Sequence, residues 1–196
     1  MCGFGQLSRF EVIQGGDGLD RELAAESRDA ERAIRLWHQK AANGRPPDLT
    51  AFDFHRLQSD WGFRFLISTD ELLEAAVFIV YGSQFANLLS LPEKPNSAIP
   101  VLRQVPTRYR GLFWEGCGEV LRHPEPARFN GAIRYGGDLE LYRAAFMPLQ
   151  GSAESSRPLI YGTFNRRAVP FNALRGVPLR HSASDQVPAE RARLIT

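Results

Sequence analysis

The order of hydrophobic and polar residues predicts five strands. Alternation with a period of two, which is typical of half-buried strands, runs through residues 61–67, 128–135 and 139–149. A continuous apolar run predicts a strand at 76–81, and a last strand is predicted at 159–165. Within 139–149, two sets of side chains face opposite ways, namely Leu139, Leu141, Ala145, Met147 and Leu149 against Glu140, Tyr142, Ala144 and Phe146. The last three strands are consecutive, and Gly136-Gly137-Asp138 predicts a tight hairpin between the first two of them. We therefore expect a three-stranded antiparallel meander after two earlier strands.

A helical period predicts a long helix near the N-terminus. Its apolar positions fall on one face and are Leu19, Leu23, Ala30, Ile34, Trp37 and Ala41. Asn43-Gly44 and then Pro46-Pro47 end it after about six turns. This apolar stripe must be covered, either by the chain's own domain or by a second copy, and the sequence leaves both alternatives open.

A second helix is predicted over residues 107–122. Its apolar face consists of Tyr109, Leu112, Phe113, Cys117, Val120 and Leu121. Gly111, Gly116 and Gly118 lie within it, and each costs about 1 kcal/mol relative to alanine in a helix interior. Either the sheet or a ligand approaches this backbone closely, or the helix is broken at the glycines. Residues 84–91 predict a further short helix.

The order of these elements predicts an α+β fold in which the helices are segregated from one antiparallel sheet. Several short motifs then resemble the stand-alone bacterial PAS-domain proteins, in which a single PAS fold follows an N-terminal helix. They are Trp37 followed by Asn43-Gly-Arg-Pro-Pro47, Val80-Tyr-Gly-Ser83 before a short helix, and Met147-Pro-Leu149 with Gly151. The resemblance covers residues 33–167.

This resemblance implies a PAS-like five-stranded antiparallel sheet with strands at about 61–68, 75–81, 127–135, 139–149 and 158–167. Helices would cross one face and enclose a pocket that either holds a small ligand or is filled by side chains. The implied organisation is an N-terminal extension and amphipathic helix over 1–44, a PAS-like domain over 45–168 and a mobile C-terminal tail over 169–196. The chain lacks the Asn-Cys-Arg-Phe type of motif of flavin photosensors, which argues against light sensing.

Composition narrows the classes of partner. The 24 Lys and Arg residues against 22 Asp and Glu give a net charge of +2, so no global positive field favours nucleic acid or an anionic membrane. Two cysteines, Cys2 and Cys117, exclude a disulfide scaffold and a cysteine-rich zinc site. No secretory signal and no apolar run of about 20 residues is present, so we expect a cytoplasmic protein.

The sequence offers little catalytic chemistry around the second helix. Gly116-Cys117-Gly118 is only part of a dinucleotide-binding motif, because Leu121 stands where the third glycine belongs. Cys117 and His123 do not share a helical face, which favours a buried structural cysteine over a nucleophile. Glu115 and Glu119 could form an acid pair, but beside Arg122 a solvated face is favoured. We therefore do not expect an enzyme.

The histidines, His38, His55, His123 and His181, show no metal-binding spacing, and the sequence requires no cofactor. If the predicted pocket held a haem, His123 would be the candidate ligand. The alternative is an ordinary solvated histidine at a helix end, where its charge suits the helix dipole.

Aromatic residues are frequent on the predicted core elements: Phe63, Phe65, Phe78, Tyr109, Phe113, Trp114, Tyr142, Phe146, Tyr161 and Phe164. They either fill one core or partly enclose an apolar ligand. The candidate pocket residues are Phe65, Phe78, Tyr109, Phe113, Cys117, Tyr142, Phe146 and Tyr161.

The leading hypothesis is a non-catalytic sensory or regulatory PAS-like module that binds a small, largely apolar molecule between the sheet and the helix over 107–122. The alternative is a ligand-free dimerisation or protein-interaction module in signal transduction. The expected partners are a second copy, bound through the N-terminal helix or the sheet, and a signalling protein, with no nucleic acid or membrane.

Overall fold

A computed structural model describes residues 17–42, 44–52, 61–69, 72–135, 138–151 and 157–170. For residues 17–28 and 170 it describes the backbone only. The helices are α1 (Asp17–Lys40), α3 (Ser83–Leu89), α4 (Val101–Gln104) and α5 (Thr107–Arg122), with 3₁₀ turns η1 (Leu49–Ala51) and η3 (Leu73–Ala75). The strands are β1 (Arg64–Ser68), β2 (Val77–Tyr81), β3 (Ala127–Tyr135), β4 (Asp138–Leu149) and β5 (Leu159–Pro170). The predicted hairpin glycines, residues 136 and 137, and the predicted tail beyond 170 lie outside the described residues.

The strands form one antiparallel sheet in the order β2-β1-β5-β4-β3. The fold class predicted from the sequence, α+β with a five-stranded antiparallel sheet, is confirmed. Strand β5 lies in the middle of the sheet, between β1 and β4, and β2 and β3 form the edges. The last three strands make the expected meander, and the β1–β2 pair is joined to it through β5.

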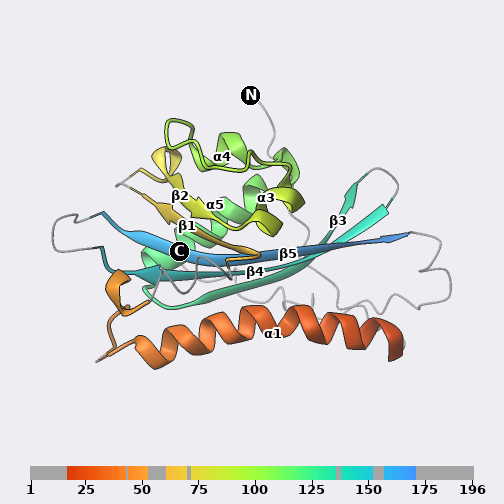
Figure 1. Cartoon of the computed structure of the whole chain (residues 1–196), viewed down its shortest axis with the longest axis horizontal. Coiled ribbons are helices and arrows are strands. Elements are labelled where there is room, and N and C mark those ends of the chain that lie inside the picture. Colours follow the sequence, from red (N-terminus) through yellow and green to blue (C-terminus); the bar gives the residue numbers. More distant parts are fainter. Residues whose placement is uncertain are drawn as a thin grey trace, which may run out of the picture.

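The sheet is the middle of three layers (Figure 1). Helices α3, α4 and α5 cover one face, and α1 runs along the other. The predicted alternation of β4 separates these layers, because Tyr142, Ala144 and Phe146 belong to the core under α5, whereas Ala145, Met147 and Leu149 face α1. These six β4 residues therefore lie on the sides that their positions in the alternating pattern predict.

Helix α1 is covered by the chain's own sheet. Ala30, Ala33 and Trp37 are buried against Met147 and Tyr161, among other residues of the second face. The indole Nε1 of Trp37 donates to the carbonyl of Pro148 at 2.6 Å, as a buried indole N–H requires. The chain's own domain therefore covers this part of the apolar stripe, which was the first of the two alternatives. The side chains of Leu19 and Leu23 lie outside the described residues.

Asp29 fixes α1 to the same face of the sheet. Its carboxylate accepts hydrogen bonds from Arg64 of β1 at 3.3 Å and from the hydroxyl of Thr163 of β5 at 3.0 Å. These two polar contacts join the helix to adjacent strands. The described residues of the apolar stripe already pack against the sheet of their own chain. Their packing therefore does not favour a dimer through these residues.

The expectation of a single aromatic core is wrong. Tyr161 lies in the cluster beneath α1, whereas Phe164 belongs to the cluster beneath α5. Successive strand residues point to opposite faces, so two positions three residues apart cannot share one. Trp114 also lies outside both clusters and is 41% exposed, and Leu121, predicted on the buried face of α5, is 38% exposed.

The glycines of α5 do not break the helix, which is continuous from Thr107 to Arg122. A Cβ on Gly116 would overlap the ring of Phe146 from β4. A Cβ on Gly162 of β5 would likewise overlap the ring of Phe65. Of the alternatives raised by the sequence, close approach by the sheet explains Gly116.

Helix α4 has no counterpart in the sequence expectations, because four residues are too few to show a helical period. Its N-terminal Val101 is buried, and the Val101 amide donates to the carbonyl of Ala76 at 2.8 Å.

Within the part of the chain that the structure describes, no helix has the length and apolar character needed to cross a membrane.

Substituting Gly116 and Gly118 separately tests the close approach of α5 to the sheet. We expect Gly116→Ala to lower the free energy of unfolding by about 1–3 kcal/mol, because the added methyl group displaces the ring of Phe146. The matched change Gly118→Ala should raise it by up to about 1 kcal/mol, because its Cβ meets only Leu73 at 3.9 Å and alanine favours the helix. Urea unfolding followed by circular dichroism measures both; equal effects of the two changes would contradict this explanation.

Candidate functional site

Seven of the eight predicted pocket residues lie together beneath α5. They belong to one buried cluster and are Phe65, Phe78, Tyr109, Phe113, Cys117, Tyr142 and Phe146. The eighth, Tyr161, lies across the sheet in the cluster that faces α1. Each of the eight is no more than 7% exposed.

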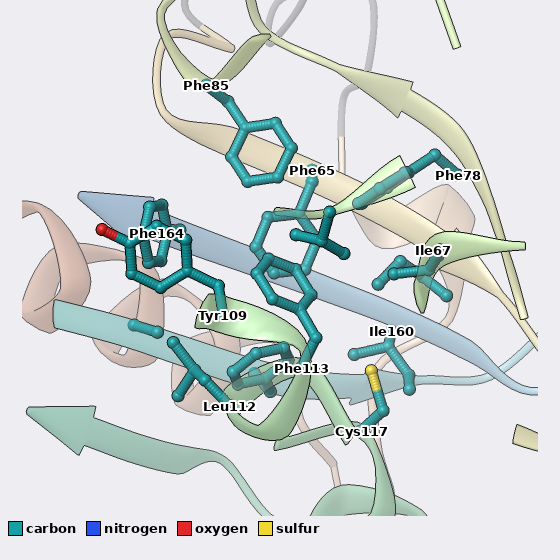
Figure 2. Packing of buried hydrophobic residues seen from close by; sticks show 14 of the residues in the cluster. Phe65, Ile67, Phe78, Phe85, Tyr109, Leu112, Phe113, Cys117, Ile160 and Phe164 are labelled. Carbon is teal, nitrogen blue, oxygen red and sulfur yellow. The ribbon is translucent and has the colours of Figure 1, made fainter. Parts of the chain in front are cut away.

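The rings of this cluster touch one another. The centroids of Phe65, Phe113 and Phe146 are 5.4–5.6 Å apart, at the distance of aromatic contact. Phe85 and Phe164 extend the same packing to α3 and β5. Figure 2 shows Phe65, Phe113 and Cys117 pointing into one region between the helices and the sheet. In the region where a ligand was predicted, the chain's own aromatic side chains are thus in mutual contact.

Cys117 lies at the edge of this aromatic region. Burial raises the pKa of its thiol, so the thiolate needed for nucleophilic chemistry is disfavoured. This environment agrees with the structural role favoured by the sequence.

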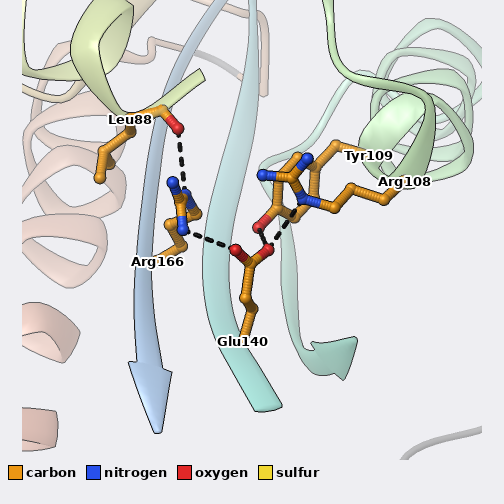
Figure 3. A network of polar contacts seen from close by, with 5 residues as sticks. All are labelled: Leu88, Arg108, Tyr109, Glu140 and Arg166. Atoms are coloured by element: carbon orange, nitrogen blue, oxygen red, sulfur yellow. Dashed lines mark hydrogen bonds and ion pairs between the residues drawn. The ribbon is translucent and has the colours of Figure 1, made fainter. Parts of the chain in front are cut away.

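A charged network lies at the N-terminal end of α5 (Figure 3). Glu140 of β4 is 5% exposed, and its Oε2 accepts hydrogen bonds from Arg108 Nε at 2.9 Å and from the Tyr109 hydroxyl at 2.5 Å. Its Oε1 accepts from Arg166 Nη1 of β5 at 2.7 Å. Arg166 Nε in turn donates to the carbonyl of Leu88 in α3 at 3.0 Å. We call Glu140, Arg108, Tyr109 and Arg166 the Glu140 network.

The electrostatics of the network keep Glu140 ionised. Burial alone would raise the pKa of Glu140, but the hydrogen bonds from Tyr109 and Arg108 and the charges of Arg166 and Arg108 outweigh it and lower the pKa. For the Tyr109 hydroxyl, burial and the bond to Glu140 raise the pKa. Each carboxylate oxygen has a charged donor, so the buried charge of Glu140 is compensated within the fold.

Arg108 connects the network to the edge strand β3. The central carbon of its guanidinium lies 4.1 Å from the centroid of the Tyr135 ring on β3 and 4.9 Å from that of Tyr109. The network therefore joins α3, α5 and three strands. No sequence expectation included it, although Glu140 was visible as a lone charge on the apolar face that also contains Tyr142 and Phe146.

A surface groove lies at the other end of α5. It has a volume of about 540 Å³, within the range of roughly 300–1,000 Å³ seen for ligand clefts, and it separates the C-terminal half of α5 from the first residues of β3. We call it the α5–β3 groove; its lining residues are Glu115, Glu119, Arg122, His123, Glu125, Pro126, Ala127, Arg128 and Phe129. The sequence predicted Glu115 and Glu119 as a solvated face, which agrees with their place at this surface.

Some of the groove's charges are already paired. Glu119 accepts from Arg122 at 2.9 Å and contacts Nδ1 of His123 at 3.1 Å, and Arg128 pairs with Glu31 of α1 at 3.5 Å. Among the described residues, Glu115 and Glu125 have no ion-pair partner. The α5 side of the groove therefore offers uncompensated negative charge.

His123, the candidate haem ligand, is a residue of this open groove and not of the aromatic interior. Its side chain is 67% exposed, as expected for the solvated alternative. Within the described ranges, no group of three His, Cys, Asp or Glu side chains comes together as a metal site would need.

Comparison with known proteins finds a remote structural likeness and no match to a family model or curated protein. A solved structure of a fungal LOV-domain photoreceptor aligns with 78% of this chain and 100% of its own at 15% sequence identity, with a TM-score of 0.39. A similarity this low supports no argument about function.

Glu140→Gln tests the charge balance of the network. The change removes the carboxylate faced by two partly buried guanidinium groups, and we expect the free energy of unfolding at neutral pH to fall by about 2–4 kcal/mol. Because folding lowers the pKa of Glu140, its contribution is present above the ordinary carboxyl pKa of 4.5 and is lost as the pH falls below it. The difference in stability between wild type and variant should therefore shrink in acid.

Denaturant unfolding at a series of pH values measures that difference. Glu74→Gln, at an exposed position on η3, is the control and should leave stability unchanged. A wild-type advantage over Glu140→Gln that stays constant down to pH values well below 4.5 would contradict the assignment.

Proposed function

We propose that this chain is a non-catalytic regulatory module of PAS-like architecture that acts by binding a signalling protein, without a resident small ligand. The observation that carries the proposal is the aromatic packing between the sheet and α5. Phe65, Phe113 and Phe146 are each 0% exposed and in mutual ring contact. A pocket for an apolar molecule at this place would require these rings to separate, which costs packing energy.

The glycines support the same conclusion. Gly116 and Gly162 let the rings of Phe146 and Phe65 lie directly on the backbone of α5 and β5. A glycine that makes room for a ligand would border empty space, whereas these two border side chains. The small-ligand site predicted at residues 65, 78, 109, 113, 117, 142, 146 and 161 remains a hypothesis that competes with this proposal.

Recognition is then assigned to the surface. Trp114 and Leu121 are exposed on α5 at 41% and 38%, and the α5–β3 groove lies along the same helix. Neither residue lines the groove, so α5 offers two separate surface features. Exposed aromatic residues are enriched at protein interfaces. The Glu140 network fixes one end of this helix to the sheet, so the surface is presented on a rigid element.

Phe113→Ala tests whether the interior is filled. Removing this ring should lower the free energy of unfolding by about 3–5 kcal/mol and leave an apolar cavity that binds benzene. We therefore expect benzene to raise the melting temperature of the variant but not that of the wild type. Phe113→Leu provides a smaller cavity if Phe113→Ala does not fold.

Trp114→Ala is the matched control on the same helix. Because Trp114 is exposed, its removal should create no cavity and no response to benzene. Native mass spectrometry of the wild-type protein should give the mass of the polypeptide alone. A co-purifying small molecule, or stabilisation of the wild type by benzene, would instead favour the internal ligand site.

Site-specific photo-crosslinking tests the interaction surface in cells that naturally express the chain. A photoreactive amino acid at position 115, beside the groove, should form an adduct with another protein. The same amino acid at Glu93, an exposed loop position, serves as the control. Equal adduct yields from both positions, or no adduct from position 115, would contradict a partner at this surface.

A further inference from the structure

Strand β3 is an edge of the sheet. All nine of its residues pair with β4, from Ala127 with Phe146 to Tyr135 with Asp138. Within the described part of the chain, no strand pairs with its other side. Its outward amide and carbonyl groups therefore form a template for another extended segment.

The pairing of β3 with β4 determines which side chains flank this edge. Phe129 is opposite Ala144, which packs beneath α5, so residues 127, 129, 131 and 133 lie on the α5 side. Arg128 is opposite Ala145, which packs towards α1, so residues 128, 130, 132 and 134 lie on the α1 side. The ion pair of Arg128 with Glu31 of α1 agrees with this assignment.

The α5–β3 groove gives the edge a wall of defined charge. A strand added beside β3 would place every second side chain under α5, next to the half-buried Phe129 and the carboxylates of Glu115 and Glu125. The remaining side chains would lie next to the arginines of the α1 side. The two sides of an added strand thus meet opposite charges.

We propose that β3 binds an extended segment of a partner protein by strand addition, with arginine or lysine side chains turned towards α5. This inference rests on the proposed interaction function and names the chemistry of the partner. Main-chain hydrogen bonds to β3 supply affinity, and alternate side chains supply specificity. The aliphatic part of each basic side chain covers Phe129 while its charge pairs with Glu115 or Glu125.

Full-length pairing of β3 with the β3 of a second copy is disfavoured by like charges. Antiparallel pairing of two complete β3 strands, centred on Gly131, places Arg128 of each copy directly opposite Arg134 of the other. Like charges in directly opposed positions destabilise a strand pair. An acidic segment is disfavoured on the α5 side by Glu115 and Glu125.

Fluorescence anisotropy with three labelled nonapeptides tests the inference on the whole chain. The probe alternates arginine with threonine, the second peptide replaces arginine with glutamate, and the third is the arginine peptide with alternate backbone amides N-methylated. We expect the probe to bind at least about tenfold more tightly than either of the others, because only it offers both the charges and the amide donors. Amide NMR shifts on binding should concentrate on β3.

Glu115→Lys should weaken binding of the probe by about tenfold, whereas Glu93→Lys, with the same change in net charge, should not. If the N-methylated peptide binds as tightly as the probe, binding depends on charge attraction alone, which would overturn strand addition. No measurable binding of the probe would overturn it as well. If crosslinking at position 115 persists in that case, the interaction function stands without strand addition. A co-purifying internal ligand would remove the proposed function itself.

Discussion

The ring of Phe146 rests on the backbone of Gly116, and this contact sets how closely α5 can approach the sheet. At that distance the rings of Phe65 and Phe113 also meet Phe146, and Phe65 in turn lies over Gly162 of the central strand. Two glycines thus permit one continuous aromatic layer. Any residue with a side chain at either position would force the layers apart, and the neighbouring rings would lose the contacts that bury them.

The close aromatic packing beneath α5 supports the proposal that recognition takes place at the surface. Outside that cluster, the distinctive features of α5 are its exposed face and the groove along its C-terminal half. In the Glu140 network, charged hydrogen bonds link the opposite end of α5 to β4, and β4 to β5, while Arg108 lies over the Tyr135 ring of β3. Because its carboxylate is matched by two guanidinium groups, the helix end is fixed without leaving a buried charge uncompensated.

The edge strand follows from the same geometry. Helix α5 lies across β3 and β4 and leaves the outer side of β3 bordered by a charged wall, while α1 occupies the second face. Edge strands commonly carry charged residues that discourage pairing between copies, and the arginines on the α1 side of β3 suit that role. In the proposed strand addition, the carboxylates on the α5 side favour a basic strand over a second copy of β3.

The sequence alone determined the five strands and the longer helices but not α4, because strand and helix periods are local properties that only a long enough segment shows. It placed α5 at residues 107–122 and separated the two faces of β4 correctly. The same alternation, applied to β5, would have put Tyr161 and Phe164 on opposite faces. Only the tertiary structure showed why Gly116 is a glycine, and only it brought Arg108, Glu140 and Arg166 together or opened the groove between α5 and β3. In the Glu140 network, for example, the bonded arginines are 26 or more positions from Glu140 in the sequence. A local pattern does not encode which distant side chains the pairing of strands will bring into contact.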